Sequence, residues 1–178
     1  MVGAFDLHPT EDVALFRLSP ADDYFSPYTI ATQPHYGSAE YMLWGYPDDV
    51  RHDMFSEASR PLNVPLIYSA GHFRRRVNGE LPINDVRGHA FYELSTPAGL
   101  CASGSPVSVR LPGRQWEAAG VYVGERGNET GTFSVGYATR SDAIAAQWPA
   151  LVEDGADLSK LCPLSPGHPD ATADAQLG

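Results

Sequence analysis

Short apolar or alternating segments, separated by residues that form turns, occupy the first two thirds of the chain. Segments of this length with a two-residue alternation are typical of β-strands that bury one face. The stretches between them are rich in Gly, Pro, Asn and Asp, as in "SPADD", "YPDD", "VNGELP" and "ERGNETG". Many short strands at such spacing predict an all-β fold, an antiparallel barrel or sandwich. The expected strands cover residues 13–18, 40–46, 64–77, 90–95, 105–111, 118–124 and 131–138.

Two details of one expected hairpin follow from its residues. Asn78 and Gly79 form a favoured turn pair, so a tight hairpin is expected at "RRRVNGELPI". Along the strand before that turn, Arg74 and Arg76 alternate with Arg75. Neighbours in a strand point to opposite faces, so the three arginines are interpreted as solvated edge charges.

The segment "SDAIAAQWPALVED" carries the one helical pattern, and a C-terminal helix is expected over residues 141–155. Ser141 is a suitable N-cap for it. Pro149 would interrupt the hydrogen bonds of a continuous helix, so the element is expected to consist of two short helical pieces. The polar, proline-rich residues 163–178 are interpreted as a disordered tail.

Charge and composition exclude several classes of function. The 178 residues suit one main domain, and the formal net charge of -10 disfavours nucleic acid as a partner. No apolar run is long enough to span a membrane and the first residues do not resemble a signal peptide, so we expect a soluble chain, cytoplasmic as given. Cys101 and Cys162 are expected to be free thiols. The histidines lack metal-ligand spacing, so neither a metal nor a cofactor is expected.

The stretch "GLCASGSPVSV", residues 99–109, places Ser103 among small residues directly before an apolar strand. A serine becomes a nucleophile when a base removes its proton, and backbone N–H groups must stabilise the oxyanion that forms. A loop of small residues lets the backbone approach that closely. On these residues alone, an ordinary hydroxyl in a turn explains the pattern as well.

The surrounding motifs extend this pattern. The serine segment resembles the Gly-Asp-Ser-Gly-Gly-Pro nucleophile loop of the chymotrypsin-like (trypsin-fold) serine peptidases, especially bacterial trypsin-like peptidase domains. "HPTEDVALFRL" resembles the segment of that family that carries the triad aspartate, and "AAGVYVGERG" resembles the strand that lines its substrate cleft. "FSVGYATRSDAI" is similar to its last strand running into a helix. Order and spacing agree across residues 8–152.

The resemblance implies a fold and a set of site residues. The fold would be a chymotrypsin-like double β-barrel with the first barrel incomplete: residues 1–30 as its remnant and residues 31–140 as the second barrel. Ser103 would be the nucleophile and Asp12 the carboxylate that orients the base. The backbone N–H groups of Cys101 and Ser103 would form the oxyanion hole, and Val123 and Gly124 would pair with the backbone of a polypeptide substrate.

The sequence departs from the family pattern at the catalytic base, which is a histidine in the family. The family's catalytic histidine precedes the aspartate by some tens of residues, whereas only eleven residues precede Asp12. His8 matches a non-catalytic position of the family. His72, in "YSAGHFRRR", lies between Asp12 and Ser103 and is interpreted as a structural or surface strand residue. Cys101 also replaces a glycine of the family loop, where a side chain can oppose the backbone conformation that an oxyanion hole needs.

Three hypotheses remain open. The first is a serine endopeptidase whose base and most of whose first barrel lie outside this chain. The second is a non-catalytic pseudopeptidase that serves as a peptide-binding or interaction module. A third makes Cys101 the nucleophile, as in viral cysteine relatives of the fold, although the thiol lies two positions before Ser103.

Overall fold

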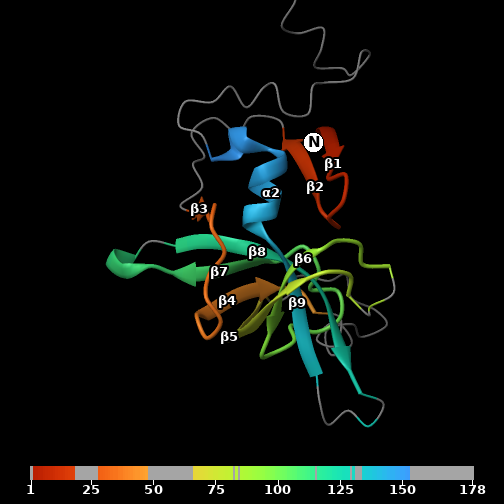
Figure 1. Ribbon diagram of the computed structural model, residues 1–178, viewed down its shortest axis with the longest axis vertical. Coiled ribbons are helices and arrows are strands. Elements are labelled where there is room, and N and C mark those ends of the chain that lie inside the picture. Colours follow the sequence, from red (N-terminus) through yellow and green to blue (C-terminus); the bar gives the residue numbers. More distant parts are fainter. Residues whose placement is uncertain are drawn as a thin grey trace, which may run out of the picture.

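The computed structural model describes residues 2–18, 28–47, 66–81, 83, 85–114, 116–128, 130 and 134–152. The strands in these ranges are β1 (Val2–Leu7), β2 (Ala14–Leu18), β3 (Tyr28–Ile30), β4 (Glu40–Gly45), β5 (Ile67–Asn78), β6 (Ala90–Leu94), β7 (Pro106–Arg110), β8 (Trp116–Gly127) and β9 (Ser134–Arg140). The helix α2 (Ser141–Gln147) follows β9 directly, and short 3₁₀ turns cover Pro112–Arg114 and Pro149–Leu151. The expectation of a mostly β chain with a C-terminal helix is confirmed (Figure 1).

Six strands close into a barrel in the order β8-β7-β4-β5-β6-β9, with β9 pairing back onto β8. All six pairings in this ring are antiparallel. Closure gives every strand of the ring a neighbour on each side, so an edge is unpaired only where one strand extends past its neighbour. The strand β3, in the segment expected to belong to the first-barrel remnant, pairs with β8 in parallel.

Two hydrophobic clusters hold the barrel strands. Inside the barrel, Phe73 stacks between Tyr41 and Tyr92, with ring centroids 5.5 and 4.1 Å apart. A second cluster, here called the outer cluster, lies under the segment between β5 and β6 and contains Leu81, Phe91, Val123, Val135 and Tyr137. Strands β6 and β9 are therefore covered on both faces, which explains their nearly continuous burial.

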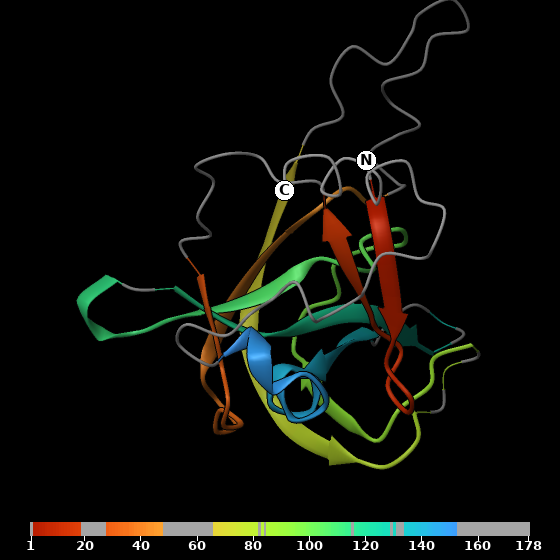
Figure 2. The ribbon, with the colours of Figure 1, turned by 90° about the horizontal axis from the view of Figure 1, so that it is seen from above.

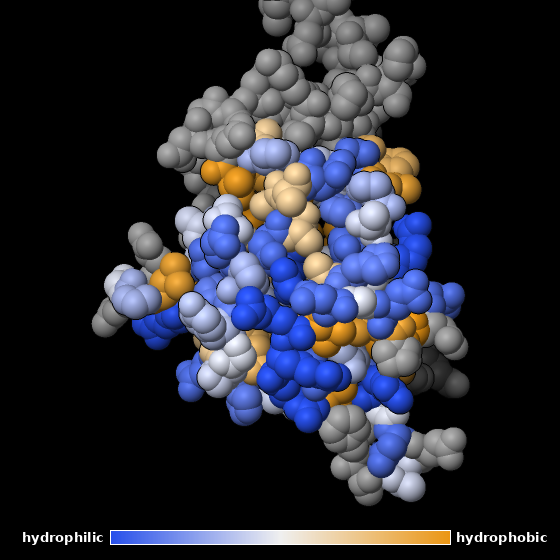
Figure 3. Space-filling view, in the orientation of Figure 1, coloured by the Kyte–Doolittle hydropathy of each residue, from blue (hydrophilic) through white to orange (hydrophobic). Residues whose placement is uncertain are grey.

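The strands β1 and β2, in the segment expected to be the first-barrel remnant, form a separate two-stranded antiparallel sheet. The helix α2 ties this hairpin to the barrel: the Trp148 indole N–H, just after α2, donates to the Asp6 carboxylate at 2.9 Å. Figure 2 shows α2 end-on, with the hairpin to one side of it. Phe5, Leu7 and Phe16 of the hairpin are exposed. Figure 3 shows a largely hydrophilic face with separate apolar patches, one of them beside this hairpin.

Two local expectations need correction. No tight turn follows Asn78, because residues 79–89 separate β5 from β6. Ser141 is not the N-cap of α2; its hydroxyl donates to the Ala31 carbonyl oxygen at 2.9 Å instead. The expected division of the C-terminal element is present, since α2 ends at Gln147 and the 3₁₀ turn begins at Pro149. The expected tail, 163–178, lies outside the described residues.

The alternation expected for the arginines is wrong because β5 contains a β-bulge between Phe73 and Arg75. The extra residue of a bulge breaks the two-residue period, so successive side chains can meet the same neighbour. Arg74 and Arg75 both pair with the buried Glu93 carboxylate, at 3.1 and 2.9 Å. Two of the three arginines thus form an ion-pair cluster on one carboxylate.

Candidate active site

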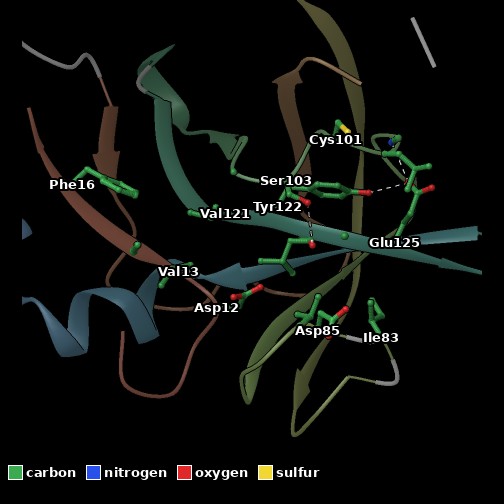
Figure 4. A pocket seen from close by; sticks show the side chains of 17 residues that line it. Asp12, Val13, Phe16, Ile83, Asp85, Cys101, Ser103, Val121, Tyr122 and Glu125 are labelled. Carbon is green, nitrogen blue, oxygen red and sulfur yellow. Dashed lines mark hydrogen bonds between the residues drawn. The ribbon is translucent and has the colours of Figure 1, made fainter. Parts of the chain in front are cut away.

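A cleft of about 670 Å³ lies where the β1–β2 hairpin meets the barrel (Figure 4). Four parts of the chain line it: the turn before β2, the segment between β5 and β6, the loop before β7, and the middle of β8. All the site residues named from the sequence lie on its wall, namely Asp12, Cys101, Ser103, Val123 and Gly124. The fold therefore gathers residues from three distant stretches of sequence at one cleft.

The loop that carries Ser103 is a sharp backbone bend. Gly99, Cys101 and Gly104 all have positive φ angles, of 89°, 66° and 93°. The Ala102 amide donates to the Gly99 carbonyl, and the Ser105 amide donates to the Ala102 carbonyl. Ala102 is buried in the bend while Ser103 is exposed above it. The bend thus presents the serine hydroxyl to the cleft.

Cys101 adopts the left-handed conformation although it carries a side chain. A left-handed φ costs an ordinary residue about 1–2 kcal/mol, so the surrounding hydrogen bonds must hold the loop in this form. In the part of the chain that the structure describes, no acceptor bonds the amide of Cys101 or of Ser103. Two uncommitted N–H groups beside a serine hydroxyl are what an oxyanion hole requires.

The Ser103 hydroxyl donates to the Val123 carbonyl oxygen at 3.2 Å. The side chain of Val123 is buried in the outer cluster, so this residue meets the cleft through its backbone. A bulge between Tyr122 and Gly124 follows on β8, while pairing with β7 reaches only to Val121. The Tyr122 amide and carbonyl still bond Ser105 and Gly104 of the serine loop; beyond Tyr122, within the described residues, β8 is paired by β9 alone. The opposite edge of β8 is open to an added strand at the cleft.

Two residues of the same turn, His8 and Glu11, hold Asp12 at the cleft. The buried His8 ring accepts the Glu11 and Thr10 amides on Nδ1, at 3.0 and 3.2 Å. With Nδ1 an acceptor, Nε2 carries the proton and points at the Ala143 carbonyl, 3.4 Å away. His8 therefore fixes the turn against α2, in agreement with its interpretation as a non-catalytic residue.

Glu11 fixes the other side of the same turn. Its carboxylate is 4% exposed and accepts the backbone amides of His89 and Ala90 at 3.1–3.3 Å. The Asp12 amide donates to the Arg87 carbonyl at 3.0 Å. Gly88 leaves room for the carboxylate, since a Cβ there would overlap it. The Glu11 carboxylate is thus structural, and the next residue, Asp12, is the one that lines the cleft.

None of the four described histidines lines the cleft. His35 pairs with Glu117 at 2.8 Å, and the His89 amide is bonded to Glu11. His72 is exposed on β5 and faces a different groove, shared with β4 and β7. His52 and His168 lie outside the described residues. In the described part of the chain, the cleft holds Ser103, two uncommitted amides and the three acidic residues Asp12, Asp85 and Glu125, but no imidazole.

Sequence reasoning missed two residues that shape the cleft. Tyr122 is 1% exposed, and its hydroxyl accepts the Ala98 amide and donates to Glu125 Oε2, both at 3.1 Å. The same Glu125 oxygen accepts the Gly99 amide at 3.1 Å. Burial is the main cause that raises the pKa of Tyr122 above its ordinary value. The alternation along "GVYVG" was the available signal, because it turns this aromatic side chain inward when the strand is part of a barrel.

The described residues contain no group of three His, Cys, Asp or Glu side chains placed to hold a metal ion. They also contain no helix with the length and apolar character needed to cross a bilayer. Cys101 is a free, exposed thiol, and Cys162 lies outside the described residues.

No protein-family model and no curated protein sequence matches this chain. Similar solved structures include Rv3671c from M. tuberculosis H37Rv, a serine-to-alanine mutant in an inactive form, with a TM-score of 0.54 and 17% sequence identity. That match covers 85% of this chain and 63% of the other. A structure of Rv3671c protease, also in an inactive form, has a TM-score of 0.51 and 17% identity, covering 85% of this chain and 66% of the other.

At 17% identity, this similarity is one of fold. It agrees with the closed β-barrel and the short helix, and it supports the expected trypsin-like serine peptidase fold. The chain spans slightly less than two thirds of the length of both solved structures.

Proposed function

We propose that this chain provides the nucleophile half of a serine peptidase site that cleaves polypeptides at Ser103. The observation that carries the proposal is the convergence at one cleft of Ser103, Asp12 and the free amides of Cys101 and Ser103. Asp12 lies in one stretch of sequence and Cys101 and Ser103 in another, and both stretches were selected by their resemblance to the chymotrypsin-like serine peptidases. Their shared location is what peptide hydrolysis requires.

In the proposed reaction, the Ser103 oxygen bonds to the peptide carbonyl carbon while a base takes the hydroxyl proton. The carbonyl oxygen becomes an oxyanion and accepts the Cys101 and Ser103 N–H groups. The C–N bond then breaks, and the proton passes from the base to the leaving amine. Water hydrolyses the acyl-serine in a second round of the same steps. Substrate backbone adds as a strand to the open edge of β8 at Val123 and Gly124.

The base is the part of this site that the described residues do not supply. Asp12 then serves as the carboxylate that orients an imidazole contributed from outside the described residues. No described imidazole lines the cleft, and the Ser103 hydroxyl donates to the Val123 carbonyl. A partner imidazole would have to replace this carbonyl as the acceptor.

The same contact favours a second candidate, a pseudopeptidase that binds peptides at the cleft without cleaving them. Without a base, the oxyanion hole and substrate binding give only a small residual rate. Peptide binding needs the open edge of β8 and the cleft, both of which are present.

Labelling by a fluorophosphonate probe distinguishes the two candidates. The peptidase proposal expects covalent labelling that disappears in Ser103→Ala and falls in Asp12→Asn, with Glu80→Gln, an exposed site away from the cleft, as the matched control. Separate His52→Ala and His168→Ala variants ask whether the base belongs to this chain. Peptide binding without any Ser103-dependent labelling would replace the peptidase proposal by the pseudopeptidase. Labelling that survives Ser103→Ala but is lost in Cys101→Ala would favour the thiol.

A further inference from the structure

The side chain of Tyr122 lies directly behind the loop that carries Ser103. The two segments are joined by a pair of backbone hydrogen bonds, from the Gly104 amide to the Tyr122 carbonyl and from the Tyr122 amide to the Ser105 carbonyl, at 2.8 and 2.9 Å. These bonds fix the distance between the tyrosine and the serine. Figure 4 shows the phenol ring beside Ser103, with its hydroxyl directed toward Glu125.

The ring occupies a space that β9 leaves for it. Ala138 stands opposite Tyr122 in the register of β8 and β9, and the neighbouring Gly136 has no side chain. A Cβ on Gly136 would come within 2.9 Å of Tyr122 Cε2, so the ring packs directly on the β9 backbone. The large Tyr122 side chain on β8 occupies the volume that the small residues Gly136 and Ala138 on β9 leave free. Removing the ring would therefore open a cavity between the serine loop and β9.

Both ends of the side chain are anchored, so the ring is a fixed wall and not a mobile one. The hydroxyl uses its proton for Glu125 and a lone pair for the Ala98 amide. Moving the ring outward would leave that amide without a partner, at a cost typical of a lost buried hydrogen bond. Glu125 also bonds Gly99, which links the phenol to the start of the serine loop.

The position of the ring bears on which acyl group fits at Ser103. A bound carbonyl must direct its oxygen at the Cys101 and Ser103 amides, with its main chain along the open edge of β8. The side chain next to that carbonyl then faces residues 98–101 and the Tyr122 ring, and the ring already fills this space. We propose that Tyr122 limits the site to substrates with a small side chain, that of glycine, alanine or serine, on the residue whose carbonyl Ser103 attacks. This inference rests on the proposed function.

The test compares two peptidyl diphenyl phosphonates that differ only in an alanine-like or a phenylalanine-like side chain next to phosphorus. The Ser103 oxygen bonds to phosphorus and displaces one phenoxide from either probe. The phenoxide takes the serine proton and leaves as phenol. We expect the unaltered chain to react at least tenfold faster with the alanine-like probe. Tyr122→Ala should reverse this preference by accepting the larger ring, and Tyr122→Phe, which keeps the ring, should retain it. Equal rates for the two probes in the unaltered chain would overturn the inference and leave the proposed function standing.

Two further measurements keep the outcome decisive. Tyr122→Leu opens part of the same space and replaces Tyr122→Ala if the latter does not fold, as judged by circular dichroism. Binding of p-cresol, the deleted side chain as a free molecule, is measured by NMR in the double variant Ser103→Ala, Tyr122→Ala. Millimolar binding that shifts the amides of residues 98–101 supports the premise that the Tyr122 ring fills space beside the serine loop. Failure of Ser103 to react with either probe would overturn the proposed function and, with it, the inference that rests on it. Absence of p-cresol binding to a folded variant would overturn the inference.

Discussion

Replacing Glu11 should destabilise the protein far more than its place in a turn suggests. The carboxylate is buried and accepts the His89 and Ala90 amides. A hydrogen bond to a charged group contributes about 1.5–3 kcal/mol, and the lower end applies at these distances of 3.1–3.3 Å. With two donors affected, Glu11→Ala should lower the free energy of unfolding by about 3 kcal/mol.

Glu11→Gln separates the hydrogen bonds from the charge. The amide oxygen can still accept both N–H groups but no longer carries a charge, so a loss of about 1–1.5 kcal/mol is expected. The control is Glu80→Ala, an exposed acidic residue in the segment after β5, which should change stability by less than about 0.5 kcal/mol. Urea unfolding of the three variants measures these differences.

Glu11→Ala should also weaken the attachment of Asp12 to the segment between β5 and β6. The Asp12 amide is bonded to Arg87 in the segment that Glu11 holds, so amide exchange at Asp12 should accelerate by about two orders of magnitude in Glu11→Ala. A loss of stability under about 1 kcal/mol in Glu11→Ala, together with unchanged exchange at Asp12, would refute the idea that this buried carboxylate places the cleft aspartate.

Three other predictions concern single groups. Thr139→Val should raise the free energy of unfolding by about 1 kcal/mol in urea, because the buried Thr139 hydroxyl has no partner among the described residues; a lower stability would mean that it has one. Cys101→Gly should raise the free energy of unfolding by about 0.5–1 kcal/mol, because glycine removes the cost of the left-handed φ but also gives the unfolded chain more freedom. A less stable variant would contradict the strain inferred for this loop. Burial raises the pKa values of Tyr41, Tyr92 and Tyr122, so above pH 10 the unfolded chain releases protons that the folded chain keeps. Stability should then fall by about 1.4 kcal/mol per pH unit for each such tyrosine, and urea unfolding at pH 9 and pH 11 that gives equal stabilities would exclude this linkage.

The sequence predicted the barrel strands well because each is a short apolar or alternating segment between turn residues, the pattern that a buried strand requires. The segment 79–89 was different, since Asn78 and Gly79 form a turn pair by local preference alone. Leu81, Ile83 and Val86 pack against the outer cluster instead, and this burial outweighs a local turn preference. Those three apolar side chains were the signal that the chain continues across the barrel before it reverses.

The residues of the candidate site could be predicted from the sequence, but the contacts that hold them in place could not. Glu11 and Asp12 are adjacent acidic residues, and no local pattern tells which is buried and which lines the cleft. That distinction depends on His8, α2 and the amides before β6, which come together only in the folded chain. The β-bulge of β5 is similar, because a run of three arginines gives no sign of the register shift that pairs two of them with Glu93.

The strand β8 carries both the barrel and the wall of the cleft. It pairs with β3, β7 and β9, and the same strand supplies Tyr122, Val123 and Glu125 to the site. A substitution on β8 that changes what the cleft binds will therefore also change how firmly the barrel closes. Redesign of ligand preference is best begun at exposed loop positions such as Asp85 and Leu100, which line the cleft without belonging to a ladder of paired strands.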